Sequence, residues 1–204
     1  MPYFTDVMVD LETTGTRPDD HAIIQICAVR FNIHTMEIDH SFFNECLLMP
    51  PTRHWDEGTR NWWSKRLSTL HSIQARMRDP REVIPEFYRW VTEGQSNEIR
   101  FWAKPLSFDF PFVSSYMNEF GPAQCFNFRI ARDLRTFMAG LTFPYDMFDE
   151  SSVPFEGTEH DALFDTLHQI KVLFAAIKEA QCKSSTLVLT ESAYSVIPTS
   201  DDAS

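Results

Sequence analysis

Apolar and polar residues first follow the pattern of β-strands. Three early segments, at residues 5–12, 22–32 and 40–49, are rich in β-branched, aromatic and other apolar residues. The turn-forming run TGTRPDD at residues 14–20 separates the first two. Because short loops join antiparallel neighbours, the pattern predicts an antiparallel start to a sheet.

The pattern then changes to helical spacing and helix-end signals. In DPREVIPEFYRWVTEG, Asp79 is placed to cap a helix, Pro80 fits its first position, and Gly94 follows its end. Further elements are predicted from apolar spacing and turn residues: a strand at 98–103, a helix at 107–121, a short strand near CFNF at 125–128, a helix around 133–140, and a helix at 160–180.

After about Cys182 the periodicity ends in a run rich in Ser, Thr and Asp. Residues 181–204 are therefore predicted to form a flexible tail, although TLVLT within it could pair with a sheet edge. Residues 1–180 are predicted to form one domain. Strands followed by alternating strands and helices indicate an α/β fold, a mixed sheet with three antiparallel strands, then parallel strands, flanked by helices.

Composition agrees with a globular protein. The chain has 204 residues, of which 43% are hydrophobic, including 18 Phe and 5 Trp, enough for one domain with a large core. The sequence has no apolar run of membrane-spanning length and no secretory signal pattern, so we expect a soluble, cytoplasmic protein that contacts no membrane. The four cysteines lack the spacing of a metal site.

The net charge of −11 argues against a partner that carries phosphates. The charge is unevenly distributed, however, because seven basic and three acidic residues lie between Arg53 and Arg81. This local excess could form a basic rim for nucleic acid, or simply a solvated helix face.

Acidic residues stand where apolar segments end. In DVMVDLETTG, Asp10 and Glu12 project from one face of a strand, and two like charges side by side favour a divalent cation between them. Asp109 in SFDFP, and His160 and Asp165 in EHDALFD, fall near predicted helix starts, which can converge at one end of a sheet. Each also has a plain explanation, such as solvent exposure or interaction with a helix dipole, and Asp161 competes with His160 as the helix cap.

Taken together, these five positions resemble the DEDDh branch of the DnaQ-like exonucleases, whose fold is similar to that of ribonuclease H. The acids, the histidine and the spacing from His160 to Asp165 occur in the same order, and Thr13-Thr14-Gly15 resembles the family's DxETTG form. The motifs WW, FDFP and RDLRT further resemble small exonucleases of the phage DexA type and the mycobacterial exoribonuclease-like type. The resemblance covers about residues 5–178.

The resemblance implies a 3′-5′ exonuclease that releases 5′-mononucleotides from the 3′ ends of single-stranded DNA or RNA. It implies two Mg²⁺ or Mn²⁺ ions held by Asp10, Glu12, Asp109 and Asp165, with Asp10 between them and His160 as general base. It also leaves a homodimer open, and it suggests a bacterial or phage-infected bacterial cell as the location. The sequence does not distinguish DNA from RNA.

Substrate contacts are predicted for seven residues beside these motifs: Leu11, Thr13, Trp62, Trp63, Phe108, Arg132 and Arg135. One of two adjacent helical tryptophans must point away from the other, so one can pack in the core while the other stacks on a base. Phe108 could equally pack in the core. Arg132 and Arg135 could form a local ion pair with Asp133 instead of binding phosphate.

Two other functions are possible for an acidic pair after a strand or for this fold. A HAD-type phosphatase requires a second Asp where Glu12 stands, and it has no place for His160 and Asp165. A catalytically silent nucleic-acid-binding domain of the same fold would be expected to lack one of the five residues, and none is missing.

Overall fold

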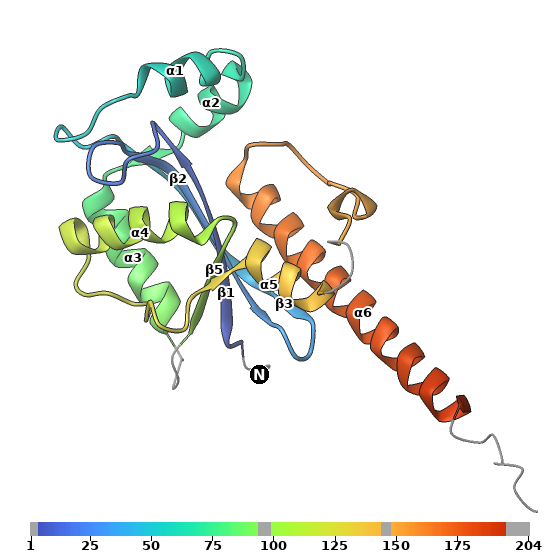
Figure 1. The fold of residues 1–204 in the computed structure, drawn as a ribbon. Coiled ribbons are helices and arrows are strands. Elements are labelled where there is room, and N and C mark those ends of the chain that lie inside the picture. Colours follow the sequence, from blue (N-terminus) through green and yellow to red (C-terminus); the bar gives the residue numbers. More distant parts are fainter. Residues whose placement is uncertain (1–3, 94–98, 144–147, 195–204) are drawn as a thin grey trace, which may run out of the picture.

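A six-stranded mixed sheet forms the centre of the computed structural model, which describes residues 4–93, 99–143 and 148–194 (Figure 1). The strand order is β4-β3-β2-β1-β5-β6. Three antiparallel strands are joined by short loops, and the remaining strands pair in parallel, as predicted. Their bounds are β1 Asp6–Thr13, β2 Ile23–Asn32, β3 Glu37–Leu47, β4 Met77–Arg78, β5 Arg100–Ala103 and β6 Arg132–Asp133.

Helices cover both faces of this sheet and one of its ends (Figure 1). Helices α3 and α4 lie on one face, α5 and α6 on the other, and α1 and α2 beyond the end of β1 and β2. The helix bounds are α1 Glu57–Trp63, α2 Leu67–Gln74, α3 Pro80–Thr92, α4 Leu106–Phe120, α5 Leu134–Thr142 and α6 Ala162–Tyr194, with a short 3₁₀ helix η1 at Glu150–Ser152.

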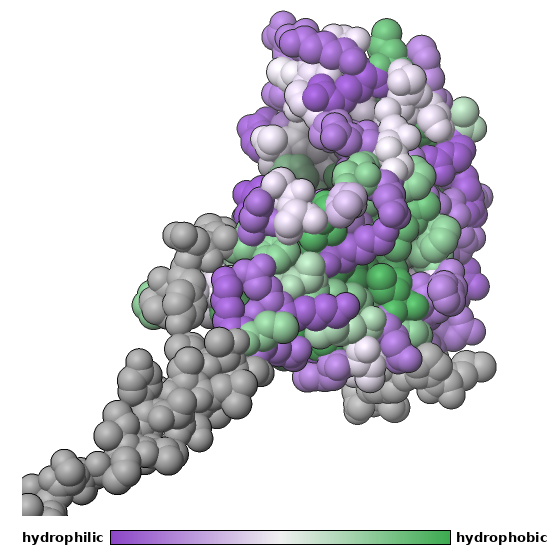
Figure 2. All heavy atoms as spheres, turned by 90° about the vertical axis from the view of Figure 1, so that its right-hand side faces the viewer, coloured by the Kyte–Doolittle hydropathy of each residue, from purple (hydrophilic) through white to green (hydrophobic). Residues whose placement is uncertain are grey.

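The two faces of β1 belong to different cores. Val7, Val9 and Leu11 pack in the core beneath α3 and α4, whereas Met8 packs in the core beneath α5 and α6. Because side chains alternate along a strand, Asp10 and Glu12 share the face of Met8 and point toward α6. Figure 2 shows the outer surface on the α5 and α6 side, where apolar side chains gather in the middle and hydrophilic ones surround them.

Helix ends follow the predicted capping residues. The Asp79 carboxylate accepts a hydrogen bond from the Arg81 N–H at 2.8 Å, and Pro80 is the first residue of α3. Gly121 ends α4, where its N–H donates to the Met117 carbonyl at 3.0 Å. These caps satisfy backbone groups that a helix leaves unpaired at its ends. The predicted end of α3 at Gly94 lies outside the described residues.

Two local predictions are wrong. CFNF is not a strand, because Phe126 packs from a loop against Phe101, with ring centroids 4.8 Å apart, and the strand that follows is β6. The TLVLT segment does not pair with a sheet edge, because α6 continues through it to Tyr194. Helix α6 therefore extends past the predicted domain boundary at residue 180. Residues 195–204 lie outside the described part, so the division into domain and tail stays a prediction.

Among the described residues, no helix combines the length and the apolar character needed to cross a membrane.

Candidate active site

Asp10 and Glu12 lie in the second half of β1, on the side that faces α6. The Gln169 amide of α6 donates a hydrogen bond to Asp10 Oδ1 at 2.8 Å, which fixes that carboxylate against the helix. The pairing of β1 with β2 becomes irregular between Glu12 and Thr13. There the Trp63 indole N–H donates to the Thr13 carbonyl at 3.1 Å, so α1 anchors the end of the strand.

Asp109 approaches the same place from α4. It lies in the first turn of that helix and is only 2% exposed. Burial and the charge of Asp10 raise its pKa, while hydrogen bonding to the Leu11 backbone opposes the shift. Asp109 therefore lies beside β1, close enough to Asp10 for the two carboxyl groups to influence each other.

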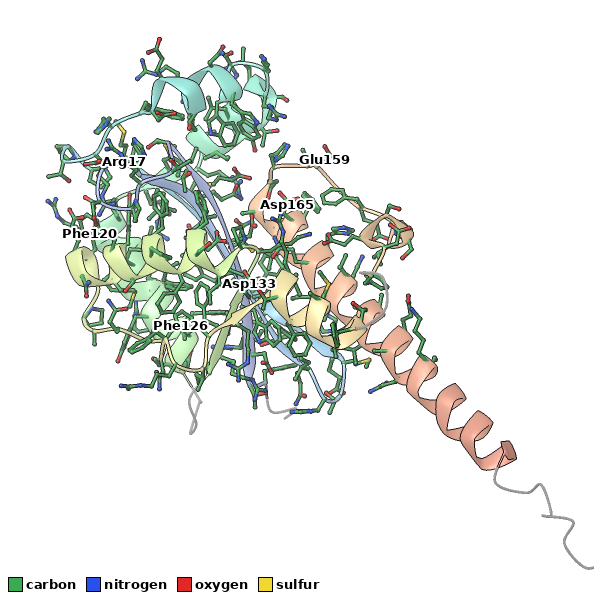
Figure 3. The ribbon with its side chains drawn as sticks, in the orientation of Figure 1. Arg17, Phe120, Phe126, Asp133, Glu159 and Asp165 are labelled. Carbon is green, nitrogen blue, oxygen red and sulfur yellow. The ribbon has the colours of Figure 1, made fainter. Side chains whose placement is uncertain are left out.

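The loop before α6 brings in the histidine. His160 adopts a left-handed backbone conformation with φ of 63°, which is uncommon for residues other than glycine. Its N–H donates to Asp165 Oδ2 at 3.0 Å, and Asp161 caps the helix by accepting the Leu163 N–H at 3.1 Å. Asp161 thus has the capping role expected for it, and His160 remains in the loop. Figure 3 shows Asp165 at the start of α6 and Asp133 at the start of α5.

Three of the predicted residues converge on one point. Ligand atoms of Glu12, His160 and Asp165 all lie within 4.8 Å of one another. Asp10 lies close to this group, since burial and the charge of Asp165 raise the pKa of Asp10 to about 7. The structure therefore gathers residues from β1, α4, and the loop and first turn of α6 at one end of the sheet.

The electrostatics of this cluster are those of crowded anions. Burial, followed by the charges of Asp10 and Asp165, raises the pKa of Glu12 well above its ordinary value. Burial, together with the charges of Asp161 and Glu159, raises the pKa of Asp165 to about 6, and the hydrogen bond from the His160 backbone N–H opposes this shift. Four carboxyl groups are thus costly to ionise together unless a cation joins them.

The cluster fits a divalent metal ion by its chemistry. Carboxylate oxygens are the ligands that Mg²⁺ and Mn²⁺ prefer. Beside them, Gln169 Oε1 is buried and has no hydrogen-bond partner among the described residues, so it can accept a hydrogen bond from a water in the metal's coordination shell. The residues that could hold metal are therefore Asp10, Glu12, Asp109 and Asp165.

A cavity of about 470 Å³ opens beside the acids. Among the residues that line it are Leu11, Glu12, Trp62, Phe108 and His160. The Trp62 and His160 rings meet edge to face, with centroids 4.7 Å apart. Burial and the charge of Arg66, whose guanidinium lies 3.7 Å from the Trp62 ring centroid, lower the pKa of His160. The cavity thus has apolar walls and the imidazole at its edge.

The other residues predicted to contact substrate do not all lie at this cavity. Thr13 and Trp63 also line this cavity, but Trp63 is 1% exposed and packs in a core with Ile24 and Ile73. Arg132 lines a different cavity, and its guanidinium donates to the Ile130 carbonyl at 2.9 Å. Arg135 lies on the surface beside the start of α4. Of the predicted contacts, the structure brings Leu11, Thr13, Trp62, Trp63 and Phe108 to the cavity and leaves both arginines outside it.

Two arginines of the local basic excess form ion pairs within the fold. Arg53 is buried and pairs with Glu119 at 2.6 Å, and Arg78 pairs with Glu86 at 2.9 Å. These arginines therefore link parts of the fold rather than present their charges to a ligand. Arg53 does not belong to a solvated face, because it is buried and its guanidinium packs over the Tyr116 ring.

The sequence patterns did not identify two polar residues that lie beside the acids, Gln169 and Gln25. Gln169 follows Asp165 by one helical turn, so its spacing on α6 could have placed it on the same face. Gln25 stands opposite Glu12 in the β1–β2 pairing and donates to Asp161 at 3.1 Å. Its role requires knowledge of strand register, which the pattern of apolar residues alone does not fix.

Solved nuclease structures share this fold. The nuclease domain of 3′hExo, a DEDDh family member bound to rAMP, aligns with a TM-score of 0.63 at 15% identity, over 87% of this chain and 94% of that one. Cell-death related nuclease 4 aligns at 0.62 and 17% identity, over 87% of this chain and 65% of that one. The metal-free complex of E. coli ExoI with single-stranded DNA aligns at 0.66 and 13% identity, over 96% of this chain but 45% of that one.

The sheet order and the flanking helices thus give the chain the fold of ribonuclease H-like nucleases, and its family model identifies it as a 3′-5′ exonuclease. Residues 5–177 match the sequence model of the Rv2179c-like 3′-5′ exoribonuclease domain, and the chain belongs to that family. No curated protein matches the sequence significantly.

Proposed function

We propose that this 3′-5′ exonuclease is metal-dependent and removes 5′-mononucleotides from the 3′ ends of single-stranded DNA or RNA. The observation that carries the proposal is the gathering of Glu12, His160 and Asp165, with ligand atoms within 4.8 Å of one another, beside a cavity with aromatic walls. A silent binding domain would not need four carboxyl groups whose pKa values are all raised by their proximity and burial.

The proposed ligands for two Mg²⁺ or Mn²⁺ ions are Asp10, Glu12, Asp109 and Asp165. When bound, two such ions stabilise the negative charge on the attacking and leaving oxygens of a phosphodiester and lower the pKa of water. The chain's own contribution is to hold the four carboxylates in fixed positions. Gln169 orients Asp10 through its 2.8 Å hydrogen bond, and the His160 N–H orients Asp165.

His160 is the proposed general base. One ring nitrogen lies within 4.8 Å of carboxylate oxygens of Glu12 and Asp165, where the attacking water would be bound. Because burial and Arg66 lower the pKa of His160, the ring is neutral near pH 7 and its free nitrogen can accept a proton. Edge-to-face contact with Trp62 limits the orientations of the ring.

The cavity is the proposed site for the terminal nucleoside. Leu11 and Phe108 offer apolar surface beside Glu12, and the exposed part of Trp62 offers a ring on which a base can stack. Thr13 would contact substrate as an acceptor, since its hydroxyl already donates to the Gly15 carbonyl at 2.7 Å. Trp63 would support this site from the core rather than touch a base.

The test compares single-stranded DNA, single-stranded RNA and duplexes with 3′ overhangs, all of matched sequence and labelled at the 3′ end. We expect labelled mononucleotides from the single strands with Mg²⁺ or Mn²⁺, and none with EDTA. Asp10→Asn serves as the inactive control. A wild-type protein that binds the strands and leaves them whole with both metals would instead be the silent binding domain.

A further inference from the structure

A second hollow lies beside the start of α4. It has a volume of about 670 Å³, within the range of roughly 300–1,000 Å³ that is typical of ligand pockets. Most of its surface is apolar, and it lies between the first turn of α4, the loop that carries Phe128, and the start of α5. We name it the α4–α5 groove; its lining includes Leu106, Ser107, Phe110, Phe128, Arg135 and Thr136.

The groove and the candidate active site share one turn of helix. Phe108 lines the catalytic cavity, and Asp109 approaches Asp10. Leu106 and Phe110 line the groove. Since each residue of an α-helix turns by about 100°, these side chains follow one another around the start of α4 in the order Phe108, Asp109, Leu106, Phe110. A chain that passes from the cavity across the acids would therefore reach the groove next.

The groove carries one exposed aromatic ring with cations beside it. Phe128 is 68% exposed, although large apolar side chains are usually buried. The Arg129 guanidinium lies 5.0 Å from the centre of its ring. Arg135, at the start of α5, also lines the groove and is exposed. An open ring flanked by positive charges suits a base and its phosphates, because bases stack on aromatic rings and phosphates bind guanidinium groups.

The groove also contains an acid, Asp133, but its charge does not cancel the preference for a base and its phosphates. Asp133 accepts the N–H groups of Leu106 and Thr136, each at 2.8 Å, so its carboxylate is engaged by the starts of α4 and α5. Burial opposes ionisation of Asp133, but these hydrogen bonds and the charge of Arg135 lower its pKa. The negative charge is thus held between two helix ends, while Arg129 and Arg135 face solvent.

We propose that the α4–α5 groove binds the part of a single strand that lies 5′ of the scissile phosphate. Phe128 stacks on a base, and Arg129 and Arg135 contact phosphates. The inference rests on the proposed function, because it assumes that the terminal nucleoside occupies the cavity beside His160. It adds a second binding site that makes longer strands better substrates than short ones.

The test separates the groove from the chemistry by the length of the substrate. The p-nitrophenyl ester of thymidine 5′-monophosphate has a terminal nucleotide and a scissile bond but no upstream strand. A single strand of about twelve nucleotides has both. We expect Phe128→Ala to raise KM for the strand about five- to tenfold, as for the loss of one base stack, and to leave kcat/KM for the ester within about twofold of wild type.

Variants of the two arginines test the groove proposal independently. With EDTA present to prevent cleavage, the affinity for the strand is measured by fluorescence anisotropy over a range of salt concentrations. Arg129→Gln and Arg135→Gln should each reduce the slope of log affinity against log salt by about 0.7, the value for one phosphate contact on a single strand. Phe42→Ala and Arg81→Gln, which alter exposed residues on β3 and α3, are the matched controls and should behave as wild type.

The outcomes distinguish the two proposals. If the wild type cleaves neither substrate, the proposed function fails. If the wild type cleaves both, but Phe128→Ala and the arginine variants bind and cleave the strand as the controls do, the groove proposal alone is overturned. An equal loss of activity of Phe128→Ala on the ester and on the strand would also overturn the groove proposal. A changed oligomeric state of this variant with unchanged strand binding would do the same, because Phe128 would then contact a second copy of the chain.

Discussion

Asp10 is a buried carboxylate of the candidate site that lies close to other carboxylates. Its pKa rises from 3.8 to about 7, mainly through burial and the charge of Asp165. Asp10→Asn removes this charge but keeps an oxygen that can accept the hydrogen bond from Gln169. We expect the variant to fold, to lose activity and to bind Mg²⁺ or Mn²⁺ more weakly in a calorimetric titration. Unchanged metal affinity would exclude Asp10 as a ligand.

His160→Ala tests the proposed base. The side chain of His160 can be removed without loss of the hydrogen bond to Asp165, because the donor is the backbone N–H. We expect kcat to fall by about 10²–10⁴-fold, the usual contribution of a general base, with metal affinity retained. His40→Ala, an exposed histidine on β3, is the control. A variant at position 160 with wild-type turnover would remove the imidazole from the mechanism.

The proximity of Glu12, His160 and Asp165 is predictable from residue type and order. Asp10 and Glu12 alternate with apolar residues on a strand, and His160 and Asp165 stand at a helix start. Arg132 was predicted from the same kind of local motif, but its guanidinium binds nearby backbone carbonyls in another cavity. A short motif identifies a residue without fixing the direction of its side chain.

Helix α1 contains two neighbouring tryptophans with different surroundings. Trp63 is buried and its indole N–H is bonded to Thr13, whereas Trp62 borders the cavity and touches His160. Trp63→Ala should lower the free energy of unfolding by about 3–5 kcal/mol, as for other large cavities in a core. Chemical denaturation measures this loss.

Trp62→Ala should leave the free energy of unfolding nearly unchanged and raise KM about tenfold through loss of a stacking surface. Trp62→Phe should restore most of the affinity, because it keeps a ring beside His160. The reverse pattern, with Trp62→Ala unstable and Trp63→Ala stable but weak in binding, would mean that the assignment of the two rings is exchanged.

The sequence predicted most elements of the sheet and failed where tertiary contacts decide the structure. Strands β1 and β2 are rich in apolar residues, β3 has them mostly in its second half, and α3 has both a cap and a proline at its start. CFNF has the composition of a strand, yet Phe126 packs from a loop because the core beside Phe101 accepts its ring without a strand partner. Strand β6 has two residues, too few for any periodic pattern.

The molecule as a whole should respond to pH through its acidic cluster. Asp10, with a pKa of about 7, and Asp165, with a pKa of about 6, bind protons more tightly in the folded chain than in the unfolded chain. Their contribution to stability is therefore present below about pH 4 and is lost as pH rises through 6 and 7. In EDTA, the Tm of Asp10→Asn should exceed that of the wild type. This difference should grow from pH 5 to pH 8, by on the order of 5 °C.

Added Mg²⁺ should raise the Tm of the wild type at pH 8 and have little effect on Asp10→Asn, since the ion stabilises only the folded state that binds it. Differential scanning calorimetry measures both comparisons. Equal pH profiles for the two proteins in EDTA would mean that the carboxyl groups do not interact as the structure indicates.

The acids come from β1, α4 and α6, which are far apart along the chain and meet only when the sheet and both helix layers are assembled. No segment that ends before Asp165 holds all four proposed ligands. During synthesis, a nascent chain of that length would therefore be unable to act as the proposed metal-dependent nuclease. The order of the segments thus delays the appearance of a nuclease until the last helix is in place.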